Sequence, residues 1–373
     1  MDFSLDREQE EFQQAIRRFV ADAAPMSGLR DMVITDLGYD AALWTRMSRE
    51  LGVAGLLVPE VYGGAEATVV EAVVAMEELG RAVVPCPLFS TVALGVVPIL
   101  AGASDEQKAA LLPAIADGTR TATTAMKDGP PGDHAIDVMR AKADGDAVTL
   151  TGTKVQVVNG HSADTLLVLA LPPGGFDEPT WYLVAGDAAG LRRERVDTFD
   201  LARPMATLTF DAVSAIPLGG GGEPEVDSGR VLNVAKVLLA AEMVGGTHGA
   251  LDMSLAYARL RHQFGRPIGS FQAIKHRCAE AATELDSARA LTLYAAHLAT
   301  QSSVDLATVA PMALATAASA FDFMASWNIQ IHGGIGFTWE HDAHLFYRRA
   351  KADRVLLGSV GDQWLEVADR IGI

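Results

Sequence analysis

Hydrophobic positions in the first third of the chain repeat with a helical period. One stripe is formed by Phe12, Ile16, Phe19 and Val20. Charged residues lie between these positions, which predicts an amphipathic helix with one buried face. Similar stripes cover 43–51 and 69–79, and Ser104 with Gln107 three residues later predicts a capping box that opens another short helix. We therefore expect residues 1–118 to form a helical domain.

The pattern changes after residue 118 to short runs rich in β-forming residues. The runs occupy 147–150, 165–171, 181–185 and 205–210. Turn signals such as Asn159-Gly160 separate them, which is typical of a compact β domain. A glycine run at 219–222 indicates a flexible connection. The sequence predicts a β domain over 119–222.

Long helical periods return in the last third of the chain. Alanine-rich stretches at 230–260, 271–301 and 305–330 predict three long helices in a bundle-like domain over 223–373. Helices, then strands, then helices again predict an α+β fold, because strands and helices do not alternate. The run 333–336, Gly-Gly-Ile-Gly, is not a dinucleotide-binding loop, since it follows a helix and lacks GxGxxG spacing.

The charge balance argues against nucleic acid as a partner. The chain has 47 acidic and 30 basic residues, a formal net charge of −17, and such a surface repels phosphates. A hydrophobic fraction of 49% with 21% charged residues indicates a globular protein rather than a disordered one.

The N-terminal residues, the apolar runs and the cysteines bear on the cellular location of the protein. The N-terminal residues lack the basic start and apolar stretch of a secretory signal. We find no uninterrupted apolar run of the roughly 18 residues that a membrane helix needs, and we expect no membrane span. Cys86 and Cys278 are far apart and outside any metal-ligand spacing, so we expect neither a disulfide framework nor a metal site. A cytoplasmic location fits these features best.

Two segments near the C-terminus carry far more specific information than composition. Residues 257–273 read YARLRHQFGRPIGSFQA, and residues 330–337 read QIHGGIGF. Both segments, in their order and separation, resemble the acyl-CoA dehydrogenase family. The helical, β, helical layout is similar to that family's fold over the whole chain.

The resemblance implies a FAD enzyme of lipid β-oxidation. Such an enzyme removes two hydrogens from the α and β carbons of an acyl-CoA thioester and passes the electrons to an electron-transfer flavoprotein. A carboxylate takes the α proton, while the flavin takes the β hydride. We therefore expect FAD as the cofactor and acyl-CoA as the substrate.

The family's FAD-binding elements are intact. In the family, the arginine of RxxFG reaches the FAD pyrophosphate of a neighbouring subunit, and the glutamines of FQ and QxxGG with the following glycines cradle the dinucleotide. The matching residues here are Arg261, Phe264, Gln272, Gln330, Gly333 and Gly334. The chemistry is suitable, because a guanidinium can hold two phosphate oxygens and glycines let the backbone approach closely.

The catalytic base, in contrast, is missing at both positions that the resemblance indicates. Aligning 348–351 with the family's RDAK-like element places Leu357 where most members carry a glutamate. A second branch carries its base where this chain has Ala235, beside Lys236. Glu242 and Asp353 are the nearby acids. We expect Glu242 to pair inside a helix contact and Asp353 to lie on a solvated helix face, so the catalytic residue stays unknown.

The β domain also departs from the family pattern. A threonine that usually contacts the flavin corresponds to Lys127, and the aromatic residue of the W/F-I-T-N element corresponds to Gln156. Long polar side chains are seldom buried without partners. We expect both side chains to be exposed, and the alternative is a reshaped flavin contact.

The intact FAD-binding elements, the missing base and the altered flavin contacts lead to three hypotheses. The chain resembles the non-catalytic subunit of heteromeric, actinobacterial-type acyl-CoA dehydrogenases, in which a paralogous partner in an α2β2 heterotetramer supplies the base and FAD lies at the mixed interface. The first alternative is a self-sufficient homo-oligomer with a displaced base. The second is an inactive scaffold that binds acyl-CoA.

Overall fold

The structure is a computed structural model of the chain that describes residues 4–129, 138–144, 147–174, 178–221 and 226–373. These residues fall into two compact units. Unit 1 contains Met1–Val33, Thr68–Pro85 and Leu232–Ile373, and unit 2 contains Ile34–Ala67 and Cys86–Val231.

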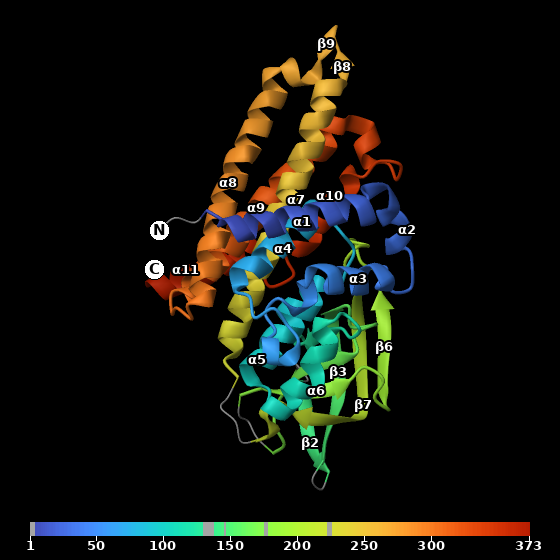
Figure 1. The fold of residues 1–373 in the computed structure, drawn as a ribbon, viewed down its shortest axis with the longest axis vertical. Coiled ribbons are helices and arrows are strands. Elements are labelled where there is room, and N and C mark those ends of the chain that lie inside the picture. The colour runs from blue at the N-terminus through green and yellow to red at the C-terminus, as the bar shows by residue number, and fades with distance from the viewer. Residues whose placement is uncertain (1–3, 130–137, 145–146, 175–177, 222–225) are drawn as a thin grey trace. The chain divides into compact units, whose positions relative to one another are not determined.

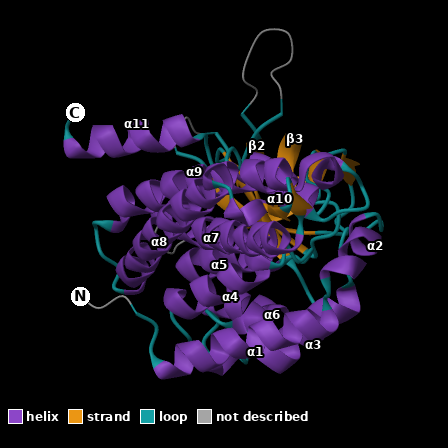
Figure 2. Cartoon of the chain, turned by 90° about the horizontal axis from the view of Figure 1, so that it is seen from above, coloured by secondary structure: helices purple, strands orange, loops and turns teal. Residues whose placement is uncertain are grey.

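Unit 1 is built almost entirely from helices. They are α1 (Arg7–Ala23), α2 (Leu29–Val33), α4 (Val69–Arg81), α7 (Ser228–Leu260), α8 (Gln272–Thr300), α9 (Leu306–His332), α10 (Ala343–Asp353) and α11 (Val360–Ile371). The long helices α7, α8 and α9 run side by side (Figures 1 and 2). The three alanine-rich stretches of the sequence predicted these three helices within two residues at each end.

Partly buried ion pairs join α1 to α4 and α4 to α8. The predicted stripe on α1 is confirmed, because Ile16, Phe19 and Val20 are buried. Glu77 and Glu78 are adjacent on α4 and both buried. Arg289 of α8 bonds to Glu77 at 2.9 Å, and Arg17 of α1 bonds to Glu78 at 2.6 Å. Burial raises the pKa of Glu77, although the Arg289 charge opposes this rise.

Glycines let α4 and α7 cross in backbone contact. A Cβ on Gly80 would lie 2.2 Å from the carbonyl oxygen of Glu242, and one on Gly245 would lie 1.9 Å from that of Glu77. A glycine near the end of a helical stripe is typical of a helix stop, but α4 continues through Gly80 to Arg81. The glycine is needed for the close approach of two helices rather than for a turn.

Unit 2 combines short helices with a seven-stranded sheet. Its helices are α3 (Ala41–Leu51), a π-helical segment at Phe89–Val96, α5 (Val97–Gly102) and α6 (Asp105–Ala116). Its strands are β1 (Ala122–Ala125), β2 (Arg140–Asp144), β3 (Ala147–Val158), β4 (Thr165–Ala170), β5 (Thr180–Ala185), β6 (Leu191–Val196) and β7 (Met205–Pro217). The predicted capping box of α6 is confirmed, since Ser104 and Gln107 bond reciprocally.

The sheet has the order β1-β4-β5-β7-β3-β2, and β6 also pairs with β7. Only β1 and β4 are parallel among the described strand pairs of this sheet. Helices α5 and α6 lie over the sheet (Figure 1), where Ile99 and Leu112 pack with Trp181 in one hydrophobic cluster. The α+β class predicted from the sequence is therefore confirmed. The predicted boundary between residues 222 and 223 lies outside the described residues, and the three-domain division stays a prediction.

One helical stretch of the described residues, Leu306–Phe337, is long and apolar enough to cross a membrane by length and composition. In its most apolar part, 56% of the residues are buried inside the protein. Such burial is typical of the core helix of a bundle, which needs an apolar surface on most sides.

Candidate functional site

The first FAD motif forms a tight hairpin that links α7 to α8. Strands β8 (His262–Gln263) and β9 (Arg266–Pro267) pair antiparallel. The two turn residues, Phe264 with φ +53° and Gly265 with φ +77°, are both left-handed, as a type I′ turn requires. The backbone N–H of Ile268 donates to the carbonyl of Arg261 at 2.8 Å and closes the base of the hairpin.

The side chains of this hairpin project outward from unit 1. Phe264 is 92% exposed, which is unusual for a large aromatic side chain at a strained backbone position. Its ring meets Phe271 edge-on at 6.1 Å, and Arg266 lies 4.2 Å above the Phe271 ring. Arg261 and Gln272 are also exposed, and their side chains have no hydrogen bond or ion pair within the described part of the chain.

The second motif ends α9. Gly333 has φ +65°, and a Cβ placed on Gly333 or Gly334 would meet no atom within 4 Å. Gln330 is exposed one turn earlier. The rings of Tyr257 and His332 lie 4.2 Å apart, so the last turns of α7 and of α9 are neighbours. The structure thereby brings the two motif segments to the same end of the bundle.

The residues at this end of unit 1 fit the phosphate and ribose part of a dinucleotide. The hairpin offers an exposed guanidinium at Arg261, and the amides of Gln272 and Gln330 are exposed. The open space at Gly333 and Gly334 leaves their backbone accessible to a ligand.

Neither position that the resemblance gave for a base carries a carboxylate. The carbonyl of Leu357 accepts a 2.8 Å bond from Gln363 Nε2 in the loop before α11. Ala235 is buried on α7. The neighbouring Lys236 is also buried, and its Nζ lies 2.6 Å from Glu366 Oε2 of α11.

Of the two nearby acids, Glu242 behaves as predicted and Asp353 does not. Glu242 accepts a bond from Arg349 of α10, and both side chains are largely buried. The expectation that Asp353 lies on a solvated helix face is wrong, because it is 1% exposed. The reason is tertiary: α10 packs along α9 and buries the end that carries Asp353.

Lys127 and Gln156 lie together on unit 2. Both are exposed, as predicted, and Lys127 Nζ donates to Gln156 Oε1 at 2.9 Å. Gln156 has φ +57° and sits in the register shift of β3 between Lys154 and Val157. Beside them Lys154 is buried, and it bonds to Asp128 at 2.7 Å. Burial lowers the pKa of Lys154, and Asp128 opposes this shift.

The sequence did not predict the ion pair between Lys236 and Glu366. Lys236 interrupts the apolar run 231–244, and a charge inside such a run signals a buried partner. That partner is Glu366, which lies 130 residues further along the chain. The hydrophobic pattern does not identify it.

Comparisons with known proteins agree with this geometry. The profile of the acyl-CoA dehydrogenase C-terminal domain matches residues 226–372, and that of the N-terminal domain matches residues 6–119. The chain belongs to the acyl-CoA dehydrogenase family. It is 32% identical over 352 residues to acyl-CoA dehydrogenase IpdE2 of Mycobacterium tuberculosis, covering 94% of this chain and 93% of that protein.

Two solved structures share the fold over nearly the whole chain. A variant of the Tcur3481-Tcur3483 steroid acyl-CoA dehydrogenase is 32% identical, with a TM-score of 0.87 and coverage of 98% of both chains. The ChsE4-ChsE5 complex of Mycobacterium tuberculosis is 24% identical, with a TM-score of 0.89 and coverage of 100% and 99%, and shows the fold alone. Family membership supports FAD as the cofactor of this acyl-CoA dehydrogenase.

Proposed function

We propose that this chain is the partner subunit of a heteromeric acyl-CoA dehydrogenase. In this assembly it contributes the Arg261 hairpin to a FAD site whose catalytic base and flavin-facing strand belong to a second, paralogous subunit. The observation that carries the proposal is a contrast within unit 1. The polar FAD-motif side chains are exposed and form no hydrogen bond or ion pair within the described residues, whereas Leu357 and Ala235 occupy the positions of the base.

The hairpin residues have separate roles in this proposal. The Arg261 guanidinium holds two oxygens of the pyrophosphate, and the amides of Gln272 and Gln330 bond to its phosphate or hydroxyl groups. Phe264 packs into an apolar pocket of the partner subunit. Its ring is 92% exposed in the isolated chain, so burial at an interface contributes a large favourable free energy. When bound, FAD supplies the acceptor for the β hydride.

Proton removal is assigned to the partner subunit. A base must be a carboxylate free to reach the α carbon of the thioester. Glu242 pairs with Arg349 in a largely buried contact, and Glu366 pairs with the buried Lys236. Using either acid as the base would break its ion pair with a buried cation, at a cost of several kcal/mol.

The exposed Lys127–Gln156 pair supports the same division of labour. An aromatic ring at position 156 could stack on the flavin, but a glutamine side chain cannot, and the Gln156 oxygen already accepts a bond from Lys127. The flavin-facing strand is therefore assigned to the partner.

The names of two similar structures support a proposal for the substrate class. The Tcur3481-Tcur3483 protein is described as a steroid acyl-CoA dehydrogenase, and both it and the ChsE4-ChsE5 complex are named for two polypeptides. We assign this chain to the oxidation of a bulky, steroid-derived acyl-CoA, with an electron-transfer flavoprotein as the electron acceptor.

The test is the FAD-to-chain ratio of the protein purified alone and after co-expression with the acyl-CoA dehydrogenase encoded nearest to it. We expect a colourless protein alone and a yellow complex with about one FAD per two chains. One FAD per chain without a partner, together with acyl-CoA oxidation, would contradict the proposal. Arg261→Gln should lower the FAD content of the complex, whereas Arg120→Gln, an exposed arginine on unit 2, should not.

A further inference from the structure

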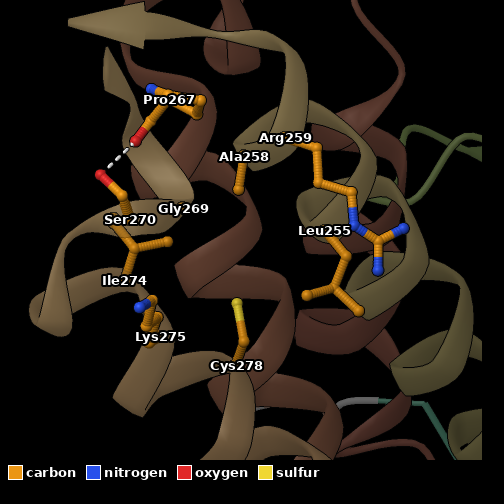
Figure 3. Close-up of a pocket in the computed structure, with 9 residues that line it drawn as sticks. All are labelled: Leu255, Ala258, Arg259, Pro267, Gly269, Ser270, Ile274, Lys275 and Cys278. Carbon is orange, nitrogen blue, oxygen red and sulfur yellow. Dashed lines mark hydrogen bonds between the residues drawn. The ribbon is translucent and has the colours of Figure 1, made fainter. Parts of the chain in front are cut away.

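A pocket of about 450 Å³ lies between the last turns of α7 and the first turns of α8 in unit 1 (Figure 3). Its walls include Leu255, Ala258 and Arg259 from α7 and Ile274, Lys275 and Cys278 from α8. None of the six FAD-motif residues is among the described residues that line it. The pocket adjoins the proposed FAD site but is lined by other residues, and binding of a ligand in it is tested without FAD.

The interior of the pocket is mainly apolar. Leu255 and Ile274 face each other across it, and the Cys278 sulfur points into the space between the two helices (Figure 3). The Ser270 hydroxyl on one wall donates to the Pro267 carbonyl at 2.7 Å, so its proton is already used. A hydrated inorganic ion would find few polar partners inside such walls.

Two cations border this apolar space. The side chains of Arg259 and Lys275 form no hydrogen bond or ion pair within the described part of the chain, and none of the described lining residues is acidic. This is unusual in a protein with a net charge of −17. Residues 253–279 contain five arginines and lysines and no aspartate or glutamate. The local field therefore attracts anions.

We infer that this pocket binds an organic anion with an apolar body, of the kind represented by a medium-chain carboxylate. Lys275 and Arg259 lie on opposite sides of the pocket (Figure 3), so the carboxylate bonds to one of these two cations while the carbon chain packs against Leu255, Ile274 and Cys278. The volume falls within the range of pockets that hold small ligands. Charge-assisted bonds provide orientation, and burial of the chain provides affinity.

The probe for this site is radiolabelled decanoate, measured by equilibrium dialysis against the full chain below the micelle-forming concentration. We expect saturable binding of about one decanoate per chain, without competition from decyltrimethylammonium, which has the same chain and the opposite charge. Arg259→Gln with Lys275→Gln should weaken binding at least about tenfold, because the double substitution removes both cations that can form a charge-assisted bond to the carboxylate.

The matched control is Arg261→Gln with Arg266→Gln. It removes two cations from the adjacent hairpin, neither of which lines the pocket, and should change decanoate affinity less than about twofold. The FAD-to-chain ratio of the complex is read separately, so failure of the FAD proposal would leave the decanoate result unaffected.

Labelling of Cys278 locates the bound probe. Burial raises the pKa of this thiol, so the maleimide reaction is run at alkaline pH and read by peptide mass spectrometry. Decanoate should slow labelling of Cys278 and leave that of Cys86 on unit 2 unchanged. The inference is overturned if decanoate does not bind saturably, if the Arg259 and Lys275 substitutions leave its affinity unchanged, or if bound decanoate does not protect Cys278.

Discussion

Replacing Phe264 with asparagine separates the folding of this chain from its assembly. The ring is 92% exposed, so its loss removes little buried surface from the chain alone. Asparagine before Gly265 is the preferred sequence for a type I′ turn, and the left-handed φ of +53° at this position suits asparagine better than phenylalanine. The isolated chain should therefore keep its stability or gain a few tenths of a kcal/mol.

Assembly should respond in the opposite way. Full burial of a phenylalanine side chain contributes about 2–3 kcal/mol, which corresponds to a roughly 30- to 150-fold weaker complex at 1.4 kcal/mol per tenfold change. The assays are thermal unfolding of the chain alone, and the dissociation constant and FAD content of the complex. Phe264→Leu keeps most of the apolar surface and should restore most of the affinity.

Val61→Asn is the matched control, since Val61 is 81% exposed and lies on unit 2 rather than on the hairpin. The reasoning is refuted if Phe264→Asn assembles as tightly as the unaltered chain, or if it destabilises the isolated chain by more than about 1 kcal/mol.

Three further predictions concern unit 1 alone. Gly245→Ala should lower the unfolding free energy by several kcal/mol, because its Cβ would lie 1.9 Å from a carbonyl oxygen of α4; Gly28→Ala, with no atom within 4 Å of the added Cβ, should change it little in the same urea titration. Glu242→Gln should destabilise the chain by about 3–5 kcal/mol, since it breaks the ion pair between Glu242 and the buried Arg349 cation. An unchanged melting temperature would refute this. Burial, together with neighbouring arginine charges, lowers the pKa of His344, so its neutral form is favoured in the fold. Its contribution to stability is complete above the unfolded pKa of about 6.5 and falls as the pH drops below that value; His344→Phe should flatten this part of the curve of unfolding free energy against pH.

Local sequence determined the helices and the motif elements of this protein. Helical periodicity and the Ser104–Gln107 capping box predicted segments that the structure contains. The turns at Phe264 and after α9 are also local features. Each depends on a left-handed backbone at one or two adjacent residues. These features depend on interactions within a few positions along the chain.

The tertiary structure decided which polar groups are buried and what they contact. Gly80 is a residue type typical of helix ends, but here it allows two helices to cross in close contact. Asp353 is buried because α10 packs along α9. Lys236 with Glu366, Glu242 with Arg349, and Lys127 with Gln156 are joined across 130, 107 and 29 residues. Periodicity along a single element identifies the face that is buried, but the group that meets this face comes from an element far away in the sequence. For that reason the sequence predicted that a base is missing at the two expected positions, and only the packed helices showed that the nearby acids are already paired or buried.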